Sequence, residues 1–279
     1  MPPEPPPFTY MAPAADCPVL VTVTHAGRDY SPSLLAAARV PRETLAGLED
    51  PLVDALAAGV PAIGAGLLVA RTPRAFVDLN RAPDDLDPGA VAGGVGLRPG
   101  RRARGGLGVV PTRLAPHGPL WRRPLPATEF ARRLDGVHRP FHALLARETA
   151  AVRDAHGMAV LLDLHSMPPP DGGADVVLGD RHGASCHRWL CEALAWAARR
   201  GGFTVGMNAP YAGGHLVARH GAPGGGVQAI QVELSRALYL QPDGRSPGPG
   251  WARTRALVEA LVRAAVDAAA DVSLPLAAE

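Results

Sequence analysis

Residues 159–164 read AVLLDL, a run in which apolar side chains occupy neighbouring positions and not alternate ones. Such a run is typical of a strand that is buried on both faces in the middle of an α/β sheet. Residues 18–24 (PVLVTVT) and 229–234 (AIQVEL) are also rich in apolar residues and predict further strands. Further apolar runs predict strands at 62–70, 74–79 and 203–207.

Helical patterns lie between these runs, which is the alternation expected of an α/β fold. Pro51 suits the first position of a helix, with Asp50 before it as the N-cap. A longer helical pattern contains Pro140, where we expect a kink or an interruption. The predicted helices cover 51–58, 128–156, 185–200 and 251–271.

The chain has 279 residues, of which 47% are hydrophobic and 19% charged, as is usual for a globular protein with a core. We expect a Pro-rich lead-in over residues 1–17 and a single domain over residues 18–279. Residues 82–126 form a long loop-like segment, and a loop of that length is often functional. An Arg-rich stretch at 98–113 lies within it.

The formal net charge of +2 argues against binding of nucleic acid or a membrane through the overall field of the protein. No apolar stretch is long enough to predict a transmembrane helix. Cys17, Cys186 and Cys191 form no disulfide framework and are expected to be reduced thiols. The N-terminal residues lack the pattern of a signal peptide, so we expect a cytoplasmic protein.

Polar residues follow or end several of the predicted strands. They are His25 after 18–24, Asn80 and Arg81 after 74–79, His165 after 159–164, and Glu233 within 229–234. In open α/β sheets, sites form outside the carboxyl ends of the strands. The sequence therefore predicts a site at this edge of the sheet.

His25 and His165 are candidate ligands of a catalytic Zn²⁺, which takes three protein ligands and keeps one open position. A histidine after a strand can also be an ordinary polar loop residue. Glu233 is the candidate general base, because a buried carboxylate in an apolar strand needs a reason. Its alternative roles are pairing with Arg236 or capping the strand end.

Arginine and asparagine side chains suit an anionic substrate. Arg81 offers a bidentate fork for a carboxylate, and Asn80 adds a neutral donor. Arg74 and Arg181 could supply further charge, although each could equally be a solvated surface residue.

For two further pairs of histidines, the sequence favours a structural role over metal binding. His138 and His142 are spaced i, i+4 and could face one side of a helix, but Pro140 between them disturbs the geometry that a metal needs. His182 and His187 flank Cys186 without completing an established zinc spacing.

Taken in order, the motifs resemble those of the N-formylglutamate amidohydrolases, from about Val19 to Tyr239. The resemblance depends on their number and order more than on any single piece. They are HAGR at 25–28, DLNR at 78–81, GLGVVPT at 106–112, DLHSMP at 163–168, LGDRHG at 178–183, NAPYAGG at 208–214 and ELSR at 233–236.

The DLNR and DLH pieces also resemble aspartoacylase and succinylglutamate desuccinylase, of the wider zinc-carboxypeptidase-like superfamily. The resemblance implies a mixed, mostly parallel sheet flanked by helices, in the phosphorylase/hydrolase-like arrangement, with one zinc ion per chain. It also implies that Asn80 and Arg81 hold a substrate carboxylate and that Glu233 activates water.

One position departs from the superfamily pattern. Arg28 stands where a His-x-x-Glu motif would place a second ligand. Asp50 is the first choice for the third ligand, because Glu49-Asp50 followed by Val53-Asp54 resembles an acidic piece of the formylglutamate family. Asp54 and Asp29 are alternatives, and Asp50 could instead be a helix N-cap.

We therefore expect zinc-dependent hydrolysis of a small anionic N-acyl amino acid, with N-formyl-L-glutamate giving formate and L-glutamate. The resemblance places that reaction in histidine degradation. A related enzyme acting on another N-acyl amino acid or a peptide is the first alternative, and a non-catalytic binding protein on the same scaffold is the second. The oligomeric state is not predicted.

Overall fold

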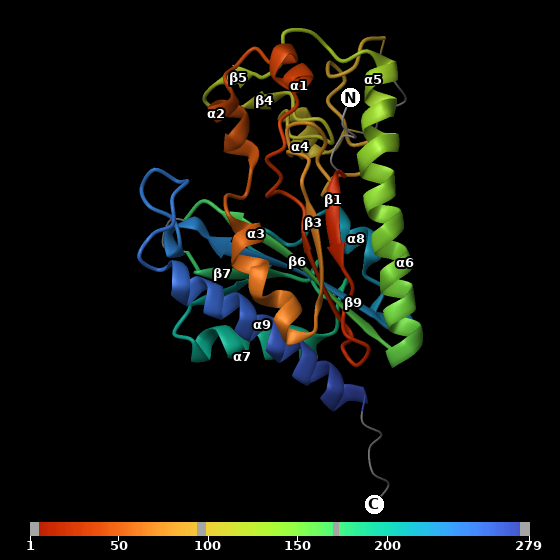
Figure 1. Cartoon of the computed structure of the whole chain (residues 1–279), viewed down its shortest axis with the longest axis vertical. Coiled ribbons are helices and arrows are strands. Elements are labelled where there is room, and N and C mark those ends of the chain that lie inside the picture. Colours follow the sequence, from red (N-terminus) through yellow and green to blue (C-terminus); the bar gives the residue numbers. More distant parts are fainter. Residues whose placement is uncertain (1–5, 94–98, 170–172, 274–279) are drawn as a thin grey trace, which may run out of the picture. The chain divides into compact units, whose positions relative to one another are not determined.

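The computed structural model describes residues 6–93, 99–169 and 173–273 (Figure 1). The described residues form two compact units. The first unit contains residues 6–9, 24–49 and 69–144, and the second contains residues 10–23, 50–68 and 145–273. Residues 1–5 of the predicted lead-in and 94–98 of the predicted long loop lie outside the described residues. The assignment of 18–279 to a single domain stays a prediction.

The main sheet has seven strands in the order β1-β3-β2-β6-β9-β7-β8, and β4 and β5 form a two-stranded sheet. Strands β2, β6 and β9 are parallel neighbours, β7 runs antiparallel to β9, and β8 is parallel to β7. The sheet is therefore mixed and mostly parallel, as predicted. The strands are β1 (Phe8–Met11), β2 (Val19–Val23), β3 (Gly66–Ala70), β4 (Arg113–Leu114), β5 (Gly118–Pro119), β6 (Ala159–Met167), β7 (Val176–Gly179), β8 (Val205–Met207) and β9 (Val227–Ser235).

The three central strands are all predicted from apolar runs in the sequence. Every residue of β2, β6 and β9 is buried. Both β6 and β9 extend beyond the predicted ends, so that His165 lies within its strand and not after it, whereas Glu233 lies within β9 as predicted. Continued pairing between the two strands explains the extension, since Met167 still lies opposite Ser235.

Helices of the second unit pack on its strands. In Figure 1 the long blue helix α9 lies beside α7, and α9 also contacts β2 and β6, whereas α8 contacts β6 and β9. No helix in the described ranges is long and apolar enough to cross a membrane. The helices are α1 (Pro32–Ala37), α2 (Arg42–Leu45), α3 (Val53–Leu56), α4 (Arg101–Arg104), α5 (Ala127–Arg133), α6 (Arg139–His156), α7 (Arg188–Arg200), α8 (His215–His220) and α9 (Trp251–Ser273).

The predicted interruption near Pro140 is a π-helical turn at Leu134–His138 that joins α5 to α6. Proline has no N–H to donate to the carbonyl four residues earlier, so the helical hydrogen-bond pattern changes at this point.

The predicted helix 51–58 is wrong at its start. Helix α3 begins at Val53, and Leu52 precedes it with φ of 60°. Pro51 is therefore not the first helical residue and Asp50 is not the N-cap. After α3 the chain continues as a 3₁₀ helix over Ala57–Ile63, which takes up the beginning of the strand predicted at 62–70.

The strand predicted at 74–79 is also absent from the described residues. Phe76 N donates to Pro73 O in a turn, and Arg74 pairs with Asp78 four residues later. Local polar contacts here outweigh the apolar pattern. The predictions also missed β7, a four-residue run between two aspartates.

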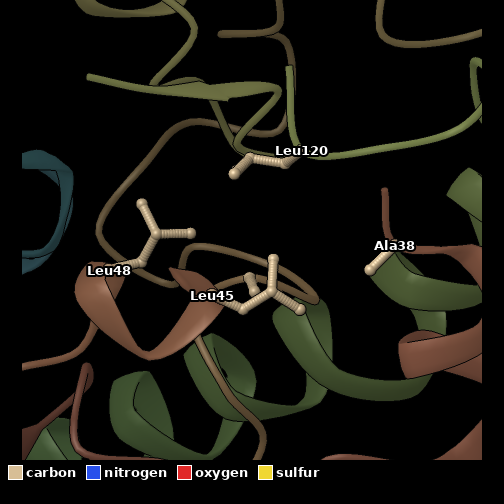
Figure 2. Packing of buried hydrophobic residues seen from close by; sticks show 5 residues of the cluster. Ala38, Leu45, Leu48 and Leu120 are labelled. Atoms are coloured by element: carbon tan, nitrogen blue, oxygen red, sulfur yellow. The ribbon is translucent and has the colours of Figure 1, made fainter. Parts of the chain in front are cut away.

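A small apolar core holds the loops of the first unit together. Figure 2 shows Ala38, Leu45 and Leu48, which come from one stretch of the sequence, and Leu120, which comes from a distant one; all four are buried. Leu45 and Leu120 have 0% exposure, so truncating either would leave a cavity.

We expect Leu45→Ala to lower the free energy of unfolding by about 2–4 kcal/mol, because it removes buried methyl groups from this core. Urea unfolding followed by circular dichroism measures the change. Leu35→Ala is the matched control, since Leu35 is 36% exposed and its loss should cost well under half as much. Equal losses in the two variants would contradict the packing described here.

Candidate functional site

A row of polar side chains crosses the three central strands of the second unit. In the register of the sheet, Thr22 lies opposite Asp163, Asp163 opposite Gln231, and His165 opposite Glu233. Because side chains alternate between the faces of a strand, all five point to one face. All five are buried.

His165 lies between two carboxylates. Its Nδ1 is 2.9 Å from Asp50 Oδ2, and its Nε2 is 2.8 Å from Asp163 Oδ2. Burial alone would lower the pKa of His165, but the nearby charges of Asp163 and Glu233 and the hydrogen bonds to Asp163 and Asp50 raise it well above its usual value. The site therefore strongly favours positive charge at the imidazole.

Asp50 contacts two side chains of the second unit. Its Oδ2 contacts His165, and its Oδ1 accepts a hydrogen bond from Arg236 Nη2 at 3.1 Å. Arg236 Nε also donates to Ser166. The side chain of Asp50 is thus directed at His165 and Arg236, in place of the predicted helix-capping role.

Glu233 accepts a hydrogen bond from Gln231. Gln231 Nε2 donates to Glu233 Oε1 at 2.7 Å, and Gln231 Oε1 accepts from Gly214 N at 2.8 Å. Both side chains are buried. The amide of Gln231 therefore fixes the position of the candidate base.

In the first unit, Asp78 joins three of the polar groups. Its Oδ1 lies 2.7 Å from His25 Nε2 and accepts from Asn80 N at 2.8 Å, while its Oδ2 accepts from Arg74 Nε at 2.8 Å. Burial alone would raise the pKa of Asp78, but the charges of Arg74, His25 and Arg81 hold it well below its usual value. Asp78 is therefore a carboxylate that orients the imidazole of His25.

The two histidines of the long helix hold the turn that carries Asn80 and Arg81. His142 Nε2 lies 2.9 Å from Leu79 O, and His138 Nε2 lies 2.8 Å from Arg81 O. A ring N–H donates to each carbonyl, because a carbonyl can only accept. The expected structural role of these histidines is seen here.

Arg81 is buried and oriented by main-chain carbonyls. Its Nε donates to Leu107 O and its Nη1 to Asn80 O. Nη2 makes no hydrogen bond within the described part of the first unit. The guanidinium therefore keeps one N–H donor, while its charge also acts on nearby Asp78.

Arg181, the remaining candidate, follows β7 in the second unit. Its side chain is exposed and has no ion pair among the described residues. Of the two alternative ligands, Asp29 pairs with Arg71 at the surface, and Asp54 lies in the first turn of α3.

Sequence reasoning missed Asp78, Asp163 and Gln231 as contributors. A signal for two of them was present, because Asp163-x-His165 and Gln231-x-Glu233 put each pair on one face of a strand. The contact of Asp78 with His25 joins residues 53 positions apart and leaves no such local pattern.

The model of the N-formylglutamate amidohydrolase family matches residues 17–240, which is most of the chain. The chain belongs to this family. It is by that membership an amidohydrolase, a hydrolase of non-peptide C–N bonds.

Individual relatives agree with the family. N-formylglutamate deformylase of Pseudomonas putida is 33% identical over 188 residues, which are 64% of this chain and 66% of that protein, just under two thirds of its length. The deformylase of Pseudomonas aeruginosa is 30% identical over 236 residues, which are 80% of this chain and 82% of that protein. The crystal structure of N-formylglutamate amidohydrolase from Ralstonia eutropha JMP134 has a TM-score of 0.86 and 33% identity, covering 95% of this chain and 98% of that one.

His220, near Asp163 in the second unit, makes the free energy of unfolding depend on pH. Burial, together with the charges of Arg219 and His215, lowers its pKa from 6.5 to about 4. The unfolded chain therefore binds more protons than the folded one between these values. Stability from this group is complete above pH 6.5 and is lost as the pH falls towards 4.

We expect His220→Gln to lose less stability than the original protein between pH 6.5 and 4, by roughly 1–3 kcal/mol. The measurement is urea unfolding of both chelator-treated proteins across this pH range. Parallel stability profiles would show that His220 is not the titrating group.

Proposed function

We propose that this amidohydrolase hydrolyses N-formyl-L-glutamate to formate and L-glutamate. The two named deformylases and the Ralstonia structure support the substrate. The observation in this chain that best supports the chemistry is His165, a buried histidine set among Asp50, Asp163 and Glu233. On this proposal the enzyme acts in the cytoplasm, in histidine degradation.

We further propose one zinc ion, held by His25, Asp50 and His165. The donor set fits, since imidazole and carboxylate are both zinc ligands. The charge fits as well. The buried carboxylates around His165 raise its pKa, and the same negative charges would stabilise a bound cation. Bound there, the ion would act as a Lewis acid and make water a stronger nucleophile at neutral pH.

The carboxylates beside the two histidines support this choice. Nε2 of His25 is engaged by Asp78, and Nε2 of His165 by Asp163. Metal-binding histidines usually give their second ring nitrogen to such a carboxylate, which fixes the ring. Nδ1 of each ring would then be the nitrogen offered to the metal. The chain also places His25 two residues after β2, the parallel neighbour of β6.

Glu233 takes a proton from the attacking water and later gives one to the leaving amine nitrogen. Its position beside Gln231 in a buried strand supports this role, because the carboxylate is fixed before the substrate binds. Asn80, Arg81 and Arg181 bind the carboxylates of the glutamate part, and Arg74 contributes through Asp78. The guanidinium groups of Arg81, which is buried, and Arg181, which is exposed, suit this recognition because an arginine side chain remains charged.

Glu233→Gln should keep about one zinc per chain and lose nearly all formate release, roughly 10²–10⁴-fold, because the amide cannot accept the proton. Metal content and formate from N-formyl-L-glutamate are measured on the same sample. Glu192→Gln, a change of an exposed glutamate on α7, is the matched control and should stay fully active.

Full activity in Glu233→Gln would remove Glu233 from the mechanism. Zinc in the original protein without formate release would move the proposal to another acyl group, which acetyl and succinyl derivatives of glutamate and aspartate would test. Absence of both metal and activity, after zinc is added back, would overturn the proposed function.

Asp163→Asn should weaken zinc binding by about 10–100-fold, because the ring of His165 loses the carboxylate that orients it. Competition with a chromophoric chelator measures the affinity. Asp154→Asn, at an exposed position on α6, is the control and should bind zinc as the original does. Unchanged affinity in Asp163→Asn would argue against His165 as a ligand.

A further inference from the structure

The loop after β7 carries a run of left-handed residues. Arg181, His182 and Gly183 have φ of 56°, 58° and 84°. This conformation is unfavourable for residues with a Cβ atom, so two of the three positions must be held by their surroundings. One of these two residues is Arg181, whose side chain is exposed.

The side chain of Asn208, at the end of β8, holds this loop. Its Oδ1 accepts from the main-chain N–H of Asp180 at 3.1 Å and of His182 at 3.3 Å, the residues on either side of Arg181. Its Nδ2 donates to Asp180 Oδ1 at 2.7 Å. One amide thus fixes the backbone before and after the arginine.

The second carboxylate oxygen of Asp180 accepts a hydrogen bond from the buried thiol of Cys191. Cys191 Sγ lies 3.4 Å from Asp180 Oδ2 and 3.4 Å from Cys186 Sγ. These three groups could hold a metal ion by their spacing. The hydrogen bond with Cys191 and burial raise the pKa of the Cys186 thiol, so it stays protonated and the group acts as a hydrogen-bonded support.

The loop also connects to the candidate base. Arg181 N donates to Ala212 O, and a Cβ on Gly179 would lie 2.7 Å from Ala212 C, so the two segments pack closely. Two residues beyond Ala212, Gly214 N bonds Gln231, which bonds Glu233. The position of Arg181 is therefore linked to that of Glu233 through hydrogen bonds of the second unit.

We propose that Asn208 is a positioning residue, which holds Arg181 in its left-handed conformation so that the guanidinium binds a carboxylate of the substrate. The inference rests on the proposed function, because it assigns Asn208 a role through Arg181 in that same reaction. Asn208 acts on binding of the anion and not on the bond that breaks.

A double-mutant cycle tests this role. Glycine is the replacement at both positions, since it removes each side chain and suits φ of 56° and 60°. The variants are Arg181→Gly, Asn208→Gly and the double change. KM and kcat for N-formyl-L-glutamate and the thermal midpoint are measured for each, with Arg188→Ala, an exposed arginine on α7, as the control.

Arg181→Gly should raise KM about 10–100-fold with kcat nearly unchanged, as expected when a charged hydrogen bond to bound substrate is lost. Asn208→Gly should raise KM at least about threefold in the original protein. In the Arg181→Gly background it should change KM by less than about twofold, because the two residues act as one unit.

The outcomes separate the two proposals. No formate release from the original protein would overturn the proposed function. Normal release with KM unchanged in Arg181→Gly would overturn the role of Arg181, and with it that of Asn208. If Asn208→Gly raises KM equally in both backgrounds, or lowers only the thermal midpoint, Asn208 is structural and the positioning role is overturned.

Discussion

Three carboxylates, Asp50, Asp163 and Glu233, are buried around His165, and such a group is stable in a protein interior only if positive charge accompanies it. Arg236 supplies part of that charge through Asp50. The pKa of His165, raised by these carboxylates, favours a proton on the imidazole as further positive charge. A zinc ion bound at His165 would bring two positive charges in place of that proton, which is why we relate the metal to this requirement.

The pairing of the central strands puts these groups together. In β6, Asp163 and His165 alternate with Leu162 and Leu164, and in β9 the partners Gln231 and Glu233 alternate with Val232 and Leu234. A slip of one residue would turn the polar row to the opposite face and break every contact described for it. The apolar residues between the polar ones therefore fix the register on which the chemistry depends.

The central strands could be predicted because their signal is local: short runs rich in apolar and β-branched residues favour a buried strand. The same signal failed at 74–79, where Arg74 and Asp78 pair across one turn of chain. The placement of His165 and Glu233 followed from their strands. The partners Asp78 and Asn208 could not be predicted, since each meets its partner across 28 or more residues, and no pattern within a window shows such contacts.

Neutral groups position both arginines assigned to the substrate. His138 and His142 hold the main chain around Asn80 and Arg81 through carbonyls, and the amide of Asn208 holds the main chain around Arg181. A carboxylate in any of these places would also pair with the guanidinium and reduce its attraction for an anion. Arg74, which does pair with a carboxylate, illustrates the difference, because its charge serves Asp78. On the proposed function, positioning through carbonyls and amides fixes the arginine without adding a carboxylate that would hydrogen-bond to it in place of the substrate.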